Sequence, residues 1–324
     1  MPEPLIAFLW PEVDFRATGL TVPDGFAIRF GRATVRAEVE AGAAGADYIL
    51  IGSGFGFVDK PLLDLAPRVR LVQLTGAGYD NVDHAECARR GIPVCHVPGL
   101  NAPSVAQLAV QLAFRLTRPL TMIEAGGETE WLAARKAHAD MAHELSGRVG
   151  VIGYGHIGKQ IARMFRGLGL EVVRAEHARQ HDPEIPGVPL DELLATSDIV
   201  TVSLPARRDT HHVLDRERVG RMKPGAMLIH VGRGGVVDDD AVAEALENGR
   251  LGAAGFDVFE SEPLPPDHPF LNLSESASNR LLVTPHVGGQ TFESKRRNFE
   301  VALGNVVRVS RGEEPINRAP GPGS

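Results

Sequence analysis

Residues 148–162 read RVGVIGYGHIGKQIA, and this stretch decides the fold. An apolar strand pattern precedes its glycines and a helical pattern follows them. Gly153, Gly155 and Gly158 have the spacing G-x-G-x-x-G, which is informative only between a strand and a helix. The first glycine allows a tight turn, the second lets a pyrophosphate approach the backbone, and the third lets the helix pack on the strand. The stretch therefore predicts a dinucleotide site.

Two further features of this region concern the cofactor. The backbone amides of His156 and Ile157, at the predicted helix N-terminus, are expected to face the phosphates. Glu176 follows the next predicted strand, 23 residues after the first glycine of the motif. A carboxylate there accepts hydrogen bonds from ribose hydroxyls and repels a 2′-phosphate, which favours NAD. His177 and Arg179 could instead bind that phosphate, so NADP stays open as an alternative.

Strand-like runs alternate with helical patterns on both sides of the glycine motif, which is typical of α/β proteins with parallel sheets. The runs form two series, one before residue 100 and one from residue 148 on. Long helical patterns flank the second series. We therefore predict two doubly wound parallel-sheet domains. The Rossmann cofactor domain spans 102–284 and is inserted into a discontinuous, flavodoxin-like substrate domain made of 1–101 and 285–324.

The composition fits a globular protein with room for two domains: 324 residues, 43% hydrophobic and 23% charged. A net charge of −7 gives no reason to expect a nucleic-acid partner. No apolar stretch is long enough to span a membrane, and Pro11 interrupts the first one, which favours a strand over a signal peptide. Cys87 and Cys95 do not form a disulfide framework. We expect a cytoplasmic protein without a membrane partner.

Three polar residues each follow a predicted strand of the second series: Arg233, Glu262 and His286. The carboxyl ends of such strands form the ligand crevice of an open α/β sheet. A guanidinium matches a carboxylate in geometry and charge, and an imidazole exchanges protons near neutral pH. Together they could bind a 2-oxo acid and protonate its carbonyl, and the glycines that flank Arg233 would let the substrate come close to it. From the residues alone, a surface ion pair and a turn histidine explain them equally well.

Five blocks of the chain resemble the D-isomer-specific 2-hydroxyacid dehydrogenase family in order and spacing, from about residue 45 to 312. The blocks are LTGAGYDNVDHAECARRGIPVCHVPGLNAPSVAQLAVQL (74–112), LSGRVGVIGYGHIGKQIA (145–162), MKPGAMLIHVGRGGVVDDDAVAEAL (222–246), GFDVFESEPLP (255–265) and LLVTPHVGGQT (281–291).

The resemblance implies a role for each polar residue of the second series. Arg233 matches the substrate-orienting arginine, and Glu262 and His286 match the acid–base pair. Asp257 matches the aspartate that holds the nicotinamide carboxamide. Hydride would pass between the nicotinamide and the 2-carbon of a small 2-oxo or 2-hydroxy acid. The family commonly has asparagine where His230 stands, so packing behind the arginine is expected to differ.

The resemblance also implies two substrate-binding loops in the other domain. Backbone amides of Gly76, Ala77 and Gly78 match the loop that receives the substrate carboxylate. Ser53 and Gly54 lie in ILIGSGFGFV, where the family has a second loop that contacts the substrate. Many members place a polar or basic residue there. Its apolar, glycine-rich character favours a substrate side chain larger or less polar than that of glyoxylate.

Other candidate residues carry weaker signals. No metal site is predicted: His211-His212 is interpreted as a surface pair, and His138 and His143 are too far apart for one helical face. Trp131 falls in a segment that resembles the family's arm at a dimer interface, with core packing as the alternative. We expect a homodimer, as is usual in this family.

The sequence thus favours an NAD(P)-dependent D-2-hydroxyacid dehydrogenase, in which the second series of strands provides both cofactor binding and acid–base chemistry. Two alternatives use the same scaffold. One is a phosphite (phosphonate) dehydrogenase, and the other is a non-catalytic NAD-sensing binding protein.

Overall fold

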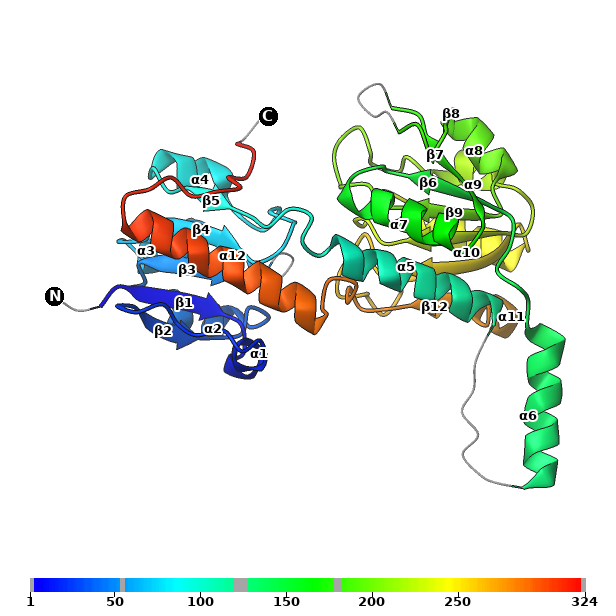
Figure 1. The fold of residues 1–324 in the computed structure, drawn as a ribbon, viewed down its shortest axis with the longest axis horizontal. Coiled ribbons are helices and arrows are strands. Elements are labelled where there is room, and N and C mark those ends of the chain that lie inside the picture. Colours follow the sequence, from blue (N-terminus) through cyan, green and yellow to red (C-terminus); the bar gives the residue numbers. More distant parts are fainter. Residues whose placement is uncertain (1–2, 53–55, 119–126, 178–181, 322–324) are drawn as a thin grey trace. The chain divides into compact units, whose positions relative to one another are not determined.

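The computed structural model describes residues 3–52, 56–118, 127–177 and 182–321. The chain forms two compact units, drawn in Figure 1. The first unit comprises Met1–Asn101 and Gly289–Ser324, and the second unit is Ala102–Gly288. The predicted boundary lies between residues 284 and 285, so the second unit extends four residues beyond it, through 288.

The first unit is built on a five-stranded parallel sheet of order β2-β1-β3-β4-β5. This is the flavodoxin-like order, as predicted. Every residue of β3 and β4 is buried, as expected where helices cover both faces of a sheet. The elements are β1 (Leu5–Leu9), α1 (Glu12–Ala17), β2 (Ala27–Phe30), α2 (Arg36–Ala43), β3 (Tyr48–Ile51), α3 (Lys60–Leu65), β4 (Leu71–Leu74), α4 (His84–Arg89), β5 (Val94–Cys95) and α12 (Phe292–Ser310).

The second unit has a seven-stranded parallel sheet of order β12-β11-β10-β9-β6-β7-β8, which is the Rossmann order with one further strand. The strand order reverses between β6 and β9, and ligands bind at such a switch point. The elements are α5 (Ala102–Thr117), α6 (Glu128–Met141), β6 (Arg148–Ile152), α7 (His156–Gly167), β7 (Glu171–Ala175), β8 (Gly187–Val188), α8 (Leu190–Thr196), β9 (Ile199–Val202), α9 (Arg216–Arg221), β10 (Ala226–His230), α10 (Asp239–Glu247), β11 (Leu251–Phe256), η1 (Pro269–Leu271), α11 (Glu275–Ser278) and β12 (Leu281–Val283).

The two helices that flank the predicted second series of strands go to different units. α5 belongs to the second unit, where it shares a hydrophobic cluster with α7 and lies beside it in Figure 1. α12 belongs to the first unit and packs Phe299, Ala302, Leu303 and Val306 against its sheet. The chain therefore returns to the first unit after the second is complete, and the predicted fold class is confirmed.

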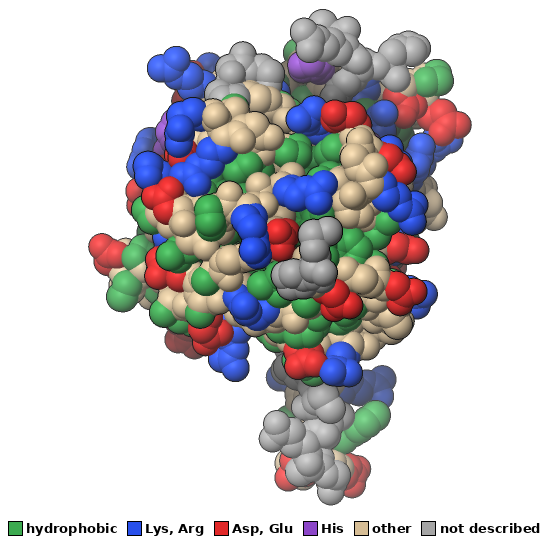
Figure 2. All heavy atoms as spheres, turned by 90° about the vertical axis from the view of Figure 1, so that its left-hand side faces the viewer, with side chains coloured by type: hydrophobic (Ala, Val, Ile, Leu, Met, Phe, Trp, Pro, Cys, Tyr) green, Lys and Arg blue, Asp and Glu red, His purple; other side chains and the backbone are tan. Residues whose placement is uncertain are grey.

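The surface shows no concentration of one charge on the face drawn in Figure 2, where Lys and Arg side chains are interspersed with Asp and Glu. Among the described residues, no helix is both long and apolar enough to cross a bilayer.

Candidate active site

The glycine motif forms the connection between β6 and α7. Gly153 has a positive φ of 90°, and a Cβ on Gly158 would lie 1.9 Å from the carbonyl oxygen of Gly153, so the first and third glycines are needed for the tight turn. A Cβ on Gly155, in contrast, would meet no atom within 4 Å. Gly155 is the N-cap of α7 and gives it no side-chain cap, which leaves the first amides of the helix, including His156 and Ile157, for an anion. These features fit a dinucleotide pyrophosphate.

Glu176 lies directly after β7 and is exposed, and its backbone N–H donates to the carbonyl of Val188 at 2.9 Å. The carboxylate is therefore accessible to a ribose at the end of β7, as predicted for NAD. His177 is exposed beside it, whereas Arg179 lies outside the described residues.

Sequence reasoning missed a partly buried cluster of side chains beside the glycine turn. The Tyr154 hydroxyl donates to Asp182 at 2.7 Å, and the guanidinium of Arg174 lies 5.4 Å from the centre of the Tyr154 ring. Burial raises the pKa of Tyr154, and the hydrogen bond to Asp182 raises it further. The cluster packs the middle residue of G-Y-G against β7 and so helps to hold the glycine turn in place.

His286 and Glu262 form the central pair of the site. The Nδ1 atom of His286 lies 2.6 Å from Oε2 of Glu262, where an Nδ1–H donates to the carboxylate. The other oxygen, Oε1, accepts from the backbone N–H of Phe259 at 3.0 Å. Partial burial raises the pKa of Glu262, but the hydrogen bond from His286 and the Phe259 amide outweigh burial, and the pKa lies below its usual value. The pair is thus an ionised carboxylate that orients an imidazole, with Nε2 left to exchange a proton.

Arg233 follows β10, at the same carboxyl-terminal edge of the sheet as the pair. Its side chain is half-buried, and one guanidinium nitrogen donates to the carbonyl of Gly232 at 3.0 Å. Its charge is close enough to contribute to the lowered pKa of Glu262. The structure therefore brings the three predicted catalytic residues to one edge of one sheet.

The sequence suggested that the glycines around Arg233 allow close approach of the substrate. The structure gives them a different role. A Cβ on Gly232 would lie 2.5 Å from the carbonyl oxygen of Leu204, and a Cβ on Gly234 would lie 1.7 Å from that of Phe259. The loops that follow β9 and β11 press against this loop from both sides. Glycine is required for backbone packing, which fixes the point from which Arg233 projects.

Asp257 is buried and binds the loop that carries His286. Its Oδ1 accepts from the Thr284 hydroxyl at 2.7 Å and from the Val287 N–H at 2.8 Å, and Oδ2 accepts from the Gly288 N–H at 2.9 Å. A carboxylate has about four acceptor positions, so one remains for a further donor. Contact between Asp257 and a nicotinamide carboxamide stays a prediction. The structure adds that Asp257 anchors the loop on which His286 lies.

Sequence reasoning did not predict the hydrogen bond that His230 makes. Its Nε2–H donates to the carbonyl oxygen of Arg233 at 2.9 Å, and its ring packs edge-on against Phe256. Burial lowers the pKa of His230 to about 4, so the imidazole is neutral at pH 7. It therefore ties the arginine loop to the end of β10 as a neutral hydrogen-bond donor.

This burial makes stability depend on pH. The folded pKa is about 4 and the usual value is 6.5, so the unfolded chain binds the proton more tightly. The contribution of the buried, neutral His230 to the free energy of unfolding is therefore full above pH 6.5 and is lost as the pH falls towards 4. Between pH 7 and 4.5 we expect His230 to account for about 2 kcal/mol of the lost free energy of unfolding.

The matched variant is His230→Asn, because asparagine can donate to the same carbonyl without titrating. Urea unfolding of both proteins at the two pH values isolates the histidine, since the carboxylates titrate alike in both. Equal losses in the two proteins would contradict a buried neutral His230.

The predicted substrate loops lie in the first unit. The carbonyl of Gly76 accepts from the Val97 N–H at 2.8 Å, and Nδ1 of His96 lies 2.8 Å from the carbonyl oxygen of Ala77. Gly78 completes this loop, which is held from one side by the segment after β5. Ser53 and Gly54 lie outside the described residues. Binding of a carboxylate by these residues stays a prediction.

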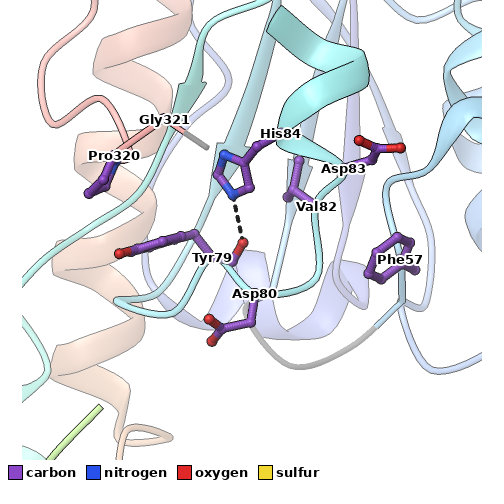
Figure 3. Close-up of a pocket in the computed structure, with 8 residues that line it drawn as sticks. All are labelled: Phe57, Tyr79, Asp80, Val82, Asp83, His84, Pro320 and Gly321. Carbon is purple, nitrogen blue, oxygen red and sulfur yellow. Dashed lines mark hydrogen bonds between the residues drawn. The ribbon is translucent and has the colours of Figure 1, made fainter. Parts of the chain in front are cut away.

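The first unit also holds a pocket of about 440 Å³ beside this loop (Figure 3). Tyr79 and His84 contribute neighbouring rings, and Nε2 of His84 lies 3.0 Å from the carbonyl oxygen of Tyr79. The predicted catalytic residues do not line it. The pocket's full lining is Phe57, Tyr79, Asp80, Val82, Asp83, His84, Pro320 and Gly321.

Known proteins are similar to this chain in sequence and in fold. Residues 110–288 match the family profile "D-isomer specific 2-hydroxyacid dehydrogenase, NAD binding domain". A glyoxylate reductase of Korarchaeum cryptofilum is 34% identical over 268 residues, covering 80% of this chain and 79% of that protein.

Two solved structures extend the similarity to almost the whole chain. The D-lactate dehydrogenase of Aquifex aeolicus, complexed with NAD and lactic acid, is 27% identical with a TM-score of 0.76, covering 98% of this chain and 99% of that one. An NADPH-dependent glyoxylate/hydroxypyruvate reductase of Sinorhizobium meliloti, in complex with NADP and malonate, is 25% identical with a TM-score of 0.76, covering 98% and 97%.

Proposed function

The chain belongs to the D-isomer-specific 2-hydroxyacid dehydrogenase family, and from that premise we propose which chemistry its residues perform. It is an NAD(P)-dependent 2-hydroxyacid dehydrogenase. We propose that it reduces a small 2-oxo acid to the D-2-hydroxy acid, or runs the reverse reaction, with Arg233, Glu262 and His286 as the catalytic residues. The observation that carries this proposal is the 2.6 Å His286–Glu262 pair at the edge where Arg233 also lies.

Each residue has a distinct task in this proposal. The Arg233 guanidinium binds the substrate carboxylate and orients the 2-oxo group. The charged Glu262 holds Nδ1 of His286 and stabilises the imidazolium, so that Nε2–H donates a proton to the substrate oxygen as it gains negative charge. In the oxidative direction, Nε2 accepts the proton from the 2-hydroxyl group. Asp257 fixes the loop on which this histidine lies.

The nicotinamide cofactor, when bound, donates or accepts the hydride at the substrate 2-carbon. The amides at the start of α7 would hold its pyrophosphate, and Glu176 would accept hydrogen bonds from its ribose. We expect NADH to be preferred over NADPH, because the exposed Glu176 carboxylate repels a 2′-phosphate. The similar structures include one with NAD and one with NADP, so both cofactors belong in the test.

The test is NADH and NADPH oxidation, followed at 340 nm, against glyoxylate, hydroxypyruvate, pyruvate, 2-oxoisocaproate and phenylpyruvate. We expect turnover of at least one acid, with a higher kcat/KM for NADH. Bulkier acids are expected to compete well with glyoxylate, since ILIGSGFGFV is apolar and rich in glycine.

Phosphite with NAD is assayed in parallel, since phosphite oxidation is the alternative enzymatic function. If NADH binds and neither phosphite nor any acid reacts, the chain is a non-catalytic NAD-binding protein and the proposal is wrong.

We further propose that the protein is a cytoplasmic homodimer. α6 has no buried side chain among its described residues and exposes Trp131 and Leu132, which are 57% and 54% accessible. An exposed apolar pair on one helix is typical of an interaction surface. Sedimentation velocity distinguishes the dimer from the monomer. The two free, buried cysteines, Cys87 and Cys95, fit a reducing compartment.

A further inference from the structure

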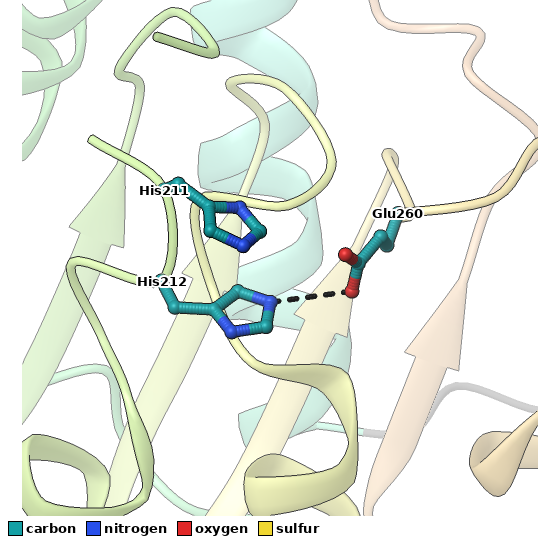
Figure 4. A group of neighbouring side chains, drawn as sticks. All are labelled: His211, His212 and Glu260. Carbon is teal, nitrogen blue, oxygen red and sulfur yellow. Dashed lines mark hydrogen bonds and ion pairs between the residues drawn. The ribbon is translucent and has the colours of Figure 1, made fainter. Parts of the chain in front are cut away.

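A group of metal-ligating side chains lies outside the catalytic residues, on the second unit. His211 and His212 stand in the loop after β9, and Glu260 stands in the loop after β11 (Figure 4). Each offers one ligand atom, and the three atoms all lie within 4.8 Å of one another. Sequence reasoning interpreted His211-His212 as a surface pair and did not connect it with Glu260, because 48 residues separate His212 from Glu260.

Backbone contacts hold the loops that carry these side chains close together. His212 adopts a positive φ of 44°, and its N–H donates to the carbonyl of Gly235 at 2.8 Å. A Cβ on Gly235 would lie 3.5 Å from Nδ1 of His211 and 4.0 Å from Cγ of Glu260, so Gly235 forms the floor of the group. The Glu260 N–H donates to the buried carboxylate of Asp239 at 3.4 Å. The loops after β9, β10 and β11 thus meet at Gly235.

The side chains already face one another. Nε2 of His212 lies 3.2 Å from Oε2 of Glu260, and the rings of His211 and His212 stack with their centres 4.1 Å apart. Ligands of a tetrahedral zinc ion lie about 3.4 Å apart, given metal–ligand distances of about 2.1 Å. His211 and Glu260 are exposed and His212 is half-buried, so side-chain rotation can close the remaining gap.

We propose that His211, His212 and Glu260 bind a divalent transition-metal ion such as Zn²⁺ or Ni²⁺. Two imidazoles and one carboxylate are the ligands that such ions prefer, whereas Mg²⁺ and Ca²⁺ prefer oxygen alone. Water would complete the coordination, because the group is open to solvent. This site is additional to the dehydrogenase activity and does not depend on it.

Binding would tie together the loops after β9 and β11, on either side of the loop that carries Arg233. Glu260 is two residues from Glu262, whose carboxylate is held by the Phe259 amide. An ion that fixes Glu260 would therefore also stabilise the backbone that carries Glu262. We expect the metal to raise the Tm in a concentration-dependent way, because it binds the folded chain preferentially.

Isothermal titration calorimetry with ZnCl₂ and with NiCl₂ tests the proposal, on full-length protein without a polyhistidine tag and after removal of metal with EDTA. The variants are His211→Asn, His212→Asn and Glu260→Gln. Asparagine suits position 212 because it tolerates positive φ, and glutamine keeps the size of glutamate. The control is His143→Asn, which removes an exposed histidine elsewhere on the second unit.

We expect one ion per chain with a micromolar Kd, weakened at least about tenfold by each of the three variants. His143→Asn should bind as the unchanged protein does. MgCl₂ should give no heat of binding. A variant that has the same Tm without metal as the unchanged protein is folded. A loss of metal binding in such a variant is then caused by the missing ligand. Absence of binding in the unchanged protein, or binding that all three variants retain, would overturn the site.

Discussion

Substitution of His286 by asparagine is expected to lower kcat by about 10²–10⁴-fold, with little change in KM for the acid or for NADH. The imidazole donates the proton in the chemical step, and asparagine cannot. Asparagine is a better probe than alanine here, because His286 adopts a positive φ of 53° that alanine tolerates poorly. Steady-state kinetics, with NADH binding followed by fluorescence, separate turnover from binding.

The matched variant for this prediction is Glu262→Gln. Glutamine keeps an oxygen that can accept from the Phe259 N–H, but it removes the charge that stabilises the imidazolium. We expect a smaller loss of kcat than for His286→Asn, because the imidazole remains. If His286→Asn retained a third or more of the kcat, or lost NADH binding as well, the acid–base assignment would be wrong.

Substitution of Arg233 by alanine is expected to reduce kcat/KM for the acid by about 10²–10³-fold, mainly through a higher KM. The guanidinium fork binds the substrate carboxylate in both the ground state and the transition state, so its loss weakens binding more than turnover. KM for NADH should change little, because the residues predicted to bind the dinucleotide lie on other loops.

Arg233→Lys separates charge from geometry at this position. Lysine keeps the positive charge but not the planar fork, so we expect kcat/KM between those of the unchanged protein and of Arg233→Ala. Added guanidinium chloride at low concentration should restore part of the activity of Arg233→Ala. Equal, mild effects of substituting Arg233 and His286 would contradict the division of labour between them.

The sequence predicted what depends on local pattern. The glycine motif requires a strand before it and a helix after it, and the structure places β6 and α7 there. Parallel strands that are connected by helices have their carboxyl ends at one edge of the sheet. The proximity of Arg233, Glu262 and His286 followed from this topology. The short strand β8 (Gly187–Val188) was missed, because two residues carry no periodic signal.

What the sequence could not predict depends on how loops pack. The glycines around Arg233 were interpreted as room for substrate, but the backbones of Leu204 and Phe259 occupy that space. The hydrogen bond from His230 to the Arg233 carbonyl arises where the chain turns back after β10, which no pattern of residue types reveals. The three loops that meet at Gly235 likewise come from distant parts of the sequence.

The most direct test of the central claim is the fate of the hydride. The unchanged protein is given NADH deuterated at both C4 positions and the best of its acids other than glyoxylate, whose product has no D isomer. It should yield a 2-hydroxy acid with one deuterium at carbon 2. Chiral chromatography with mass spectrometry should find that deuterium in the D isomer, one for each cofactor oxidised. Formation of the L isomer, loss of the deuterium to solvent, or failure to reduce any 2-oxo acid would contradict the account.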